Sequence, residues 1–170
     1  EHLLDVQEAA LRFVETQLDA RDQVMMVAFN ESARILWPTR DRSRIEKAIL
    51  SIRPRGATSL HDFLALALLQ IPSAGYRRAV VVFSDGLDTT SLFSSAEVSE
   101  VARRSGVPIY VLALRPTIGG YVSKGGRAAV LEPTPFEIVR REQRRLKALA
   151  RSTGGKVFDL DSLEKLSSMW

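Results

Sequence analysis

The sequence predicts an α/β domain built on a mainly parallel sheet. Three short runs that are rich in apolar residues, at 24–29, 77–86 and 107–114, have the length and composition of strands buried inside a sheet. Longer stretches with helical periodicity separate them, and strands that alternate with helices are typical of a layered α/β arrangement. With 170 residues, of which 45% are hydrophobic and 26% charged, the chain has the size and composition of one globular domain.

The first elements are expected to be a helix and a β-hairpin. Across residues 3–18, apolar residues recur at helical spacing, and they are Leu3, Leu4, Leu11, Val14 and Leu18. The run VMMVAF at 24–29 has the composition of a strand that is buried on both faces. A second run, ARILWP at 33–38, follows after only three polar residues, 30–32, so the two runs predict a hairpin that gives the sheet one antiparallel edge strand.

Three helices are expected to begin at a capping box, in which a serine and an acid three residues later satisfy free N–H groups of the first turn. They are predicted at 43–52 with Ser43 and Glu46, at 60–71 with Ser59 and Asp62, and at 94–106 with Ser94 and Glu97. The second of these helices is apolar almost all round, which predicts deep packing. Gly106 is placed to end the third helix.

The C-terminal part completes a three-layer pattern. After the strand at 107–114 we expect a long loop at 116–134, a helix at 136–152, a short strand at 156–160 and the beginning of another helix. The fold class is therefore predicted to be a Rossmann-like open sheet, mostly parallel, with helices on both faces. Ligands of such sheets bind at the carboxyl ends of the strands, and Asp85 lies at one of those ends.

Composition and motifs exclude several function classes. The chain has no cysteine, which removes disulfides, thiolate metal sites and cysteine nucleophiles. The patterns GxxxxGK[ST], GxGxxG, GxSxG and HExxH are absent, so neither a phosphate-binding loop nor a nucleophile elbow is indicated. Only two histidines, His2 and His61, are present, too few for a histidine-rich zinc site. We therefore expect no enzyme.

The net charge of +4 is concentrated in the block RREQRRLKALAR at 140–151. This block is either the solvated face of a helix or a patch for nucleic acid, anionic lipid or an acidic protein. No aromatic residue interleaves with the arginines, which argues against stacking on single-stranded nucleic acid. We expect no nucleic-acid partner, and no apolar run has the roughly 20 residues that a membrane span needs.

Two loops are predicted to converge at one end of the sheet and to offer oxygen atoms. They are GATSLHD at 56–62 and SDGLDTTS at 84–91, and their polar side chains are Thr58, Ser59, Asp62, Ser84, Asp85, Asp88, Thr89, Thr90 and Ser91. Hydroxyls and carboxylates without nitrogen or sulfur suit a hard cation such as Mg²⁺, Mn²⁺ or Ca²⁺. The same residues also fit local roles, because Ser59 and Asp62 have capping-box spacing and Asp85-Gly86 has the composition of a turn.

The order DQVMMVAFN, GATSLHD, RRAVVVFSDGLDTTS and VPIYVLAL resembles the von Willebrand factor type A domain, in particular bacterial proteins related to it. The likeness extends over residues 1 to about 160. It implies a metal-ion-dependent adhesion site made from an Asp-x-Ser-x-Ser motif, a threonine and an aspartate. Thr58 and Asp85 match the last two ligands, while Ser59, Asp62, Ser84, Gly86 and Asp88 would surround them.

The chain departs from the family pattern at the first strand. No Asp-x-Ser-x-Ser sequence occurs in the chain, which begins at the helix that follows this strand in the family. We therefore expect residues 1–170 to be a single domain truncated at the N-terminus and also at the C-terminus, with an incomplete site for Mg²⁺ or Mn²⁺, or for Ca²⁺. The missing strand is central in the family, so an open slot is expected between the strands at 24–29 and 77–86, where a strand swapped from a second copy would fit.

The resemblance implies a protein-binding or adhesion module that holds a partner's carboxylate through the cation. The expected partner is a protein that presents an acidic residue, and an extracellular or periplasmic location is favoured. The alternative is a metal-free structural or assembly domain, in which Asp85 anchors a loop.

Overall fold

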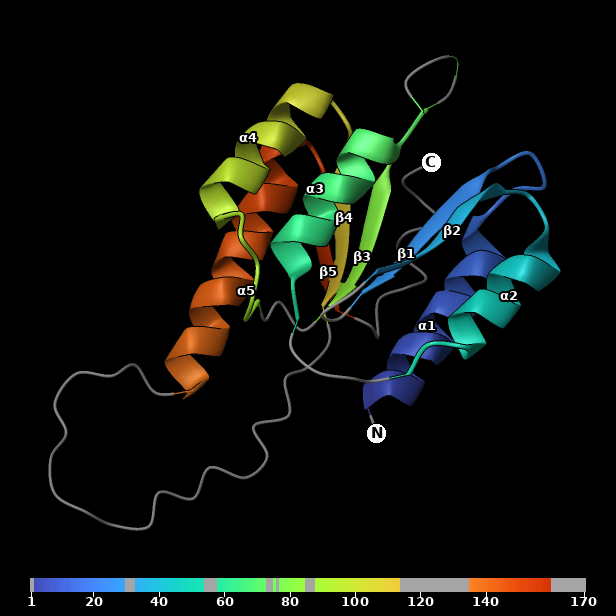
Figure 1. Ribbon diagram of the computed structural model, residues 1–170, viewed down its shortest axis with the longest axis horizontal. Coiled ribbons are helices and arrows are strands. Elements are labelled where there is room, and N and C mark those ends of the chain that lie inside the picture. Colours follow the sequence, from blue (N-terminus) through green and yellow to red (C-terminus); the bar gives the residue numbers. More distant parts are fainter. Residues whose placement is uncertain are drawn as a thin grey trace, which may run out of the picture.

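The computed structural model describes residues 2–29, 33–53, 58–72, 75, 77–84, 88–113 and 135–159 of the chain (Figure 1). Five helices and five strands lie in these ranges: α1 (His2–Gln17), β1 (Val24–Phe29), β2 (Ala33–Thr39), α2 (Arg42–Leu50), α3 (Leu60–Gln70), β3 (Val80–Ser84), α4 (Ser95–Ser105), β4 (Ile109–Ala113), α5 (Pro135–Ser152) and β5 (Val157–Asp159). Each has a counterpart in the sequence prediction, with bounds that agree to within a few residues. The loop at 116–134, the turn at 30–32 and the final helix lie outside the described residues.

The described strands form two sheets. β1 and β2 pair antiparallel, for example Val27 with Ile35, which confirms the predicted hairpin and antiparallel edge. β3, β4 and β5 form a parallel sheet in that order, with Val82 opposite Val111. In the described part of the chain, no strand is hydrogen-bonded between β1 and β3, where the slot was expected. A strand exchanged with a second copy at this place stays a prediction.

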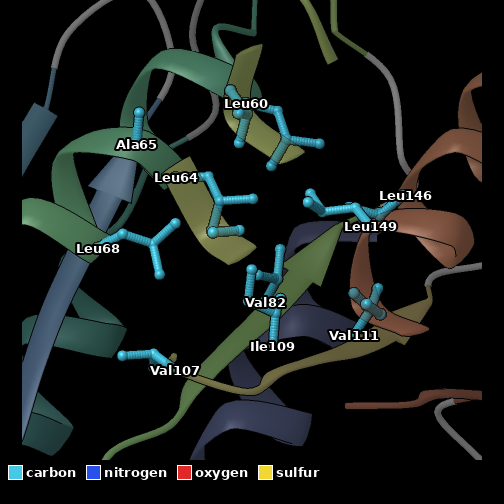
Figure 2. Packing of buried hydrophobic residues seen from close by; sticks show 13 residues of the cluster. Leu60, Leu64, Ala65, Leu68, Val82, Val107, Ile109, Val111, Leu146 and Leu149 are labelled. Atoms are coloured by element: carbon cyan, nitrogen blue, oxygen red, sulfur yellow. The ribbon is translucent and has the colours of Figure 1, made fainter. Parts of the chain in front are cut away.

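Helices cover both faces of the strands, which confirms the three-layer arrangement (Figure 1). The side of α3, α4 and α5 holds the larger core, and Figure 2 shows leucines of α3 and α5 around Val82 of β3 and around Ile109 and Val111 of β4. Its members are Leu60, Leu64, Ala65, Leu68, Val82, Val98, Ala102, Val107, Ile109, Val111, Leu146, Leu149 and Ala150. Full burial of one such side chain stabilises the fold by about 1.5–3 kcal/mol, so this layer is the main source of stability.

Helix α1 lies across both sheets on the opposite side. The ring of Phe13 packs edge-on against Phe83 of β3, with centroids 6.1 Å apart, and it lies with Leu112 of β4 in one buried cluster. One residue further along, Val14 packs with Ile45 and Ile49 of α2 over the β1–β2 pair. The side chain of Arg42 donates to the carbonyl oxygens of Val14 and Leu18, which joins the C-terminal half of α1 to α2. Thus α1 connects two sheets that share no described hydrogen bond.

Strand β1 is less buried than its sequence predicted. All six residues of VMMVAF are partly exposed, whereas four of the five residues of β4 are buried. The expectation of a strand buried on both faces was therefore wrong for β1. The physical reason is the number of neighbours, because β1 pairs only with β2 among the described strands. Helix α3 is also not packed all round, since Leu69 is 73% exposed.

The predicted caps were right at one helix and wrong at two. Ser94 and Glu97 form the expected capping box at α4, and Gly106 ends that helix in the left-handed conformation. Helix α2 is instead capped by Asp41, whose carboxylate accepts from the N–H of Arg44, so the helix begins one residue before Ser43. Ser59 occupies the cap position of α3 but makes no capping hydrogen bond there. Within the described residues, no helix has the length and apolar character that crossing a bilayer requires.

Candidate functional site

The candidate site lies where β3 ends and α3 begins, at the same end of the parallel sheet (Figure 1). Thr58 and Ser59 lead into α3, and the segment 88–94 leads from the region after β3 into α4. Ser84, the last residue of β3, is buried. Asp85 and Gly86, two of the predicted site residues, lie outside the described residues.

Backbone hydrogen bonds fix Thr58 against the second loop. Its carbonyl oxygen accepts from the N–H of Thr89 at 2.8 Å and from that of Thr90 at 3.3 Å. Its own N–H donates to the hydroxyl of Thr89 at 2.9 Å. The hydroxyl of Thr58 has no hydrogen-bond partner within the described ranges. The structure therefore holds the backbone of Thr58 in place and leaves its side-chain oxygen available for a ligand.

Asp88 organises the turn of the second loop. Its carboxylate accepts from the N–H of His61 at 2.8 Å, from the N–H of Ser91 at 3.1 Å and from the hydroxyl of Ser91 at 2.5 Å. The Nδ1 atom of His61 lies 3.3 Å from the same carboxylate, whose side chain is only 9% exposed. Burial raises the pKa of Asp88, but the hydrogen bonds from Ser91 and His61 outweigh burial and hold the pKa below its usual value.

Asp62 holds the next part of the second loop, residues 92–93, in a similar way. Its two carboxylate oxygens accept from the N–H groups of Leu92 at 3.0 Å and Phe93 at 2.8 Å. The predicted capping box of α3 is therefore wrong, because Asp62 reaches across to the second loop. Ser59 also turns to that loop, and its hydroxyl lies 2.8 Å from the hydroxyl of Thr90. A neighbouring loop with free N–H and hydroxyl groups offers both side chains partners that the capping pattern does not take into account.

The arrangement brings together Thr58, Ser59, Asp62 and Asp88 but gives them different roles. Both carboxylates are engaged with backbone N–H groups, so they stabilise the loops and are poorly available to a cation. Among the described residues, no group of three acidic, histidine or cysteine side chains is placed to hold a metal ion. Of the two predicted ligands, Thr58 lies in the described part and Asp85 does not, and the ligand role predicted for each stays a prediction.

Sequence reasoning missed an apolar pair at the rim of this site. Leu92 is 93% exposed and Phe93 is 45% exposed, although Asp62 fixes the backbone of both. The available signal was an apolar dipeptide inside a polar loop, directly after hydroxyl residues.

Comparison with known proteins gives a family and a fold. The family model of the von Willebrand factor type A domain matches residues 2–87, which is half of the chain. No curated protein matches the chain. Among solved structures, it is similar to an aerotolerance-related membrane protein from Bacteroides fragilis NCTC 9343 with multiple mutations to serines, at 18% identity and a TM-score of 0.66, covering 98% of this chain and 84% of that one.

A second similar structure is the conserved hypothetical protein BatB from Bacteroides thetaiotaomicron. Its identity to this chain is 19% and the TM-score is 0.67, with 98% of this chain and 85% of that chain covered. At such identities the likeness concerns the fold alone. It extends over nearly the whole chain, beyond the half that the family model matches.

Proposed function

Because the chain belongs to the von Willebrand factor type A family, we propose that it is a protein-binding module that acts without catalysis. Domains of this family are generally protein-interaction modules. The observation that supports a site at the carboxyl end of the sheet is the cross-linking of the two loops by hydrogen bonds. These bonds fix Thr58 and leave its hydroxyl without a described partner. A preorganised loop of this kind binds a partner with little loss of entropy.

In this proposal Thr58 and Asp85 bind a divalent cation. The bound cation would in turn coordinate a carboxylate of the partner protein. A hydroxyl and a carboxylate favour Mg²⁺ or Mn²⁺, while Ca²⁺ needs more oxygen ligands than these two residues supply. Asp62 and Asp88 position the loops, since their carboxylates already accept from backbone N–H groups. The proposed partner is a protein with an exposed acidic residue, outside the cytoplasm.

The apolar rim is proposed to add contact area next to the cation. Leu92 and Phe93 extend from the loop whose backbone Asp62 fixes. This rim of the cation site would lie inside the interface with the partner, where buried apolar side chains contribute more affinity than charges at the edge of the interface do.

A metal-free assembly domain is the second candidate, and one observation favours it. The described acids of the two loops are used in hydrogen bonds within the protein, and the described residues contain no cluster of three metal-binding side chains. In this case Asp85 would anchor its loop in the way that Asp62 and Asp88 anchor theirs. The two candidates differ in whether a cation binds.

Calorimetric titration of Mn²⁺ separates the candidates. We expect binding by the unmodified chain, loss of binding in Asp85→Ala, and weakening in Thr58→Ala, because each variant removes a proposed ligand. Ser94→Ala is the matched control, since it removes a hydroxyl that caps α4 and should leave Mn²⁺ binding unchanged. Absence of binding by the unmodified chain, with far-UV circular dichroism that shows a folded protein, would contradict the cation proposal and favour the assembly domain.

A further inference from the structure

Helix α5 carries a row of cations on its outer face, and we call Arg140, Arg144, Lys147 and Arg151 the α5 basic stripe. All four side chains are exposed. At about 100° of rotation per residue, they fall within roughly 60° of the helix circumference, and at about 1.5 Å of rise they extend over roughly 16 Å. The opposite side of α5 carries Leu146, Leu149 and Ala150, which are buried in the larger core.

Three members of the stripe differ from other basic residues of this layer in having no ion pair within the described ranges. Arg141 and Arg145, on the flank of α5, bind the buried carboxylate of Glu142 at 3.3 Å and 2.8 Å. Arg103 and Arg104 of α4 bind Glu100 at 2.8 Å and 2.6 Å. For Arg144, Lys147 and Arg151, by contrast, no carboxylate lies within ion-pair distance among the described residues.

The charge of the whole chain is concentrated on this helix. Helix α5 contains six basic and two acidic residues, a net charge of +4, which equals the formal net charge of the complete sequence. The rest of the chain is therefore balanced. An open depression of about 420 Å³ lies between the side chains of Arg140, Gln143, Arg144 and Lys147, so the cationic groups are accessible. A local field of one sign attracts an anionic surface.

The chemistry of the stripe indicates which polyanion fits. The large exposed hydrophobic residues of the described chain, Leu4, Trp37, Leu50, Leu69, Leu92 and Phe93, all lie outside α5. Among the α5 side chains whose exposure is described, there is thus no large exposed apolar anchor of a tight protein interface and no exposed aromatic ring that stacks on single strands. Helix α5 packs against α4 and β4 with its buried side, so the stripe lies on the outside of the layer. A flat anionic surface can contact a straight row of cations without apolar anchors and without aromatic rings.

We propose that the α5 basic stripe docks the domain onto a bilayer that contains anionic phospholipid, with α5 parallel to the bilayer plane. The attraction is electrostatic. Each cation near such a surface changes the partition coefficient of the protein between water and membrane by about fivefold. It falls as salt rises, because the Debye length is about 8 Å at physiological ionic strength. This docking surface is separate from the candidate cation site, so either proposal stands without the other.

Sedimentation with vesicles tests the docking surface. The full chain is mixed with phosphatidylcholine vesicles, with and without phosphatidylserine, at low and at physiological salt. We expect binding only with phosphatidylserine, and a loss of about 25-fold in Arg144→Gln/Lys147→Gln at low salt. The matched control is Arg103→Gln/Arg104→Gln, which removes the same charge from an ion-paired pair on α4 and should change the partition coefficient less than about threefold.

Several results would overturn the proposal. Equal losses in the two double variants would mean that net charge alone matters. Equal binding with and without phosphatidylserine would exclude an electrostatic surface, and no binding to either would exclude docking. Tighter binding to duplex DNA than to anionic vesicles at the same salt would assign the stripe to nucleic acid. Thermal unfolding of both variants checks that each remains folded.

Discussion

Strands β1 and β4 have similar apolar sequences but different environments. VMMVAF in β1 is partly exposed along its whole length, while IYVLA in β4 is buried at four of five residues. β4 has β3 and β5 on its two sides and clusters of apolar residues on both faces. β1 has one described neighbour, β2. An apolar run thus predicts a strand, whereas the burial of that strand depends on how many strands and helices surround it.

The largest expected difference between the two halves comes from leucine truncation. Leu112→Ala in β4 should lower the free energy of unfolding by about 4 kcal/mol, because it empties a fully buried position. Leu36→Ala in β2 removes the same atoms from a partly exposed position, and about 2 kcal/mol is expected. Urea denaturation of both variants measures the difference. Equal losses would show that the β1–β2 half is packed as tightly as the parallel half.

Close packing in the parallel half can also be tested from the opposite direction, by adding an atom. A Cβ atom at Gly155 would lie 1.9 Å from the carbonyl oxygen of Ile109, so the backbone must move in Gly155→Ala. We expect a loss of about 3 kcal/mol. In Gly106→Ala the added atom meets nothing, and only the left-handed backbone conformation is strained, at roughly 1–2 kcal/mol. A smaller loss at Gly155 than at Gly106 would contradict the close approach of β4 and the residues before β5.

The loop network offers a way to test whether α3 couples the two halves. Phe63 of α3 packs on Phe29 of β1, with centroids 5.7 Å apart, while Leu64 of α3 belongs to the larger core. Asp88→Asn weakens the hydrogen bond to the N–H of His61 at the start of α3 and should cost about 1–2 kcal/mol. The unfolding transitions of this variant, followed by circular dichroism and by the fluorescence of the two tryptophans, should still coincide if the two halves unfold together. Separate transitions would show that the two halves are not coupled.

Asp88 also predicts a pH dependence. Its pKa is lower in the folded than in the unfolded protein, so its stabilising contribution is complete above the unfolded value of 3.8 and is lost as pH falls through the folded pKa. Denaturation from neutral pH to below pH 3.8 should show a smaller acid-induced loss in Asp88→Asn than in the unmodified chain. An identical acid dependence would mean that Asp88 does not retain its charge-stabilising bonds in solution.

The smallest expected losses of stability are those of two serine variants at the start of helices. Ser94→Ala removes a capping box and should cost about 1 kcal/mol. Ser59→Ala removes a contact between two hydroxyls, of which Thr90 is exposed to water, so about 0.5 kcal/mol is expected. Thermal unfolding distinguishes the two. A larger loss in Ser59→Ala would indicate that Ser59 caps α3 in solution.

The sequence predicted the order of elements well because hydropathy and helix signals are local. It identified the hairpin, the parallel strands and the capping box at Ser94. It predicted that the loops at 56–62 and 84–91 converge, but its capping interpretation of Ser59 and Asp62 failed because their partners, Thr90, Leu92 and Phe93, come from a loop distant in sequence. It also overestimated the burial of VMMVAF, since no local pattern reports how many strands lie beside a given strand. The predicted ligand role of Asp85 stays a prediction.

The connections between strands also set which parts of the chain can meet early in folding. β1 and β2 pair residues that are near in sequence, as close as Phe29 with Ala33, so little chain entropy is lost when they meet. The parallel strands pair Val80 with Ile109 and Val111 with Val157, and each pairing requires a crossover that contains a helix. A hairpin forms within about 1–10 μs, and closing long crossovers is slower. The most deeply buried half is thus expected to be completed last, and the early hairpin gains its full helix cover only when α1, α2 and α3 are in place.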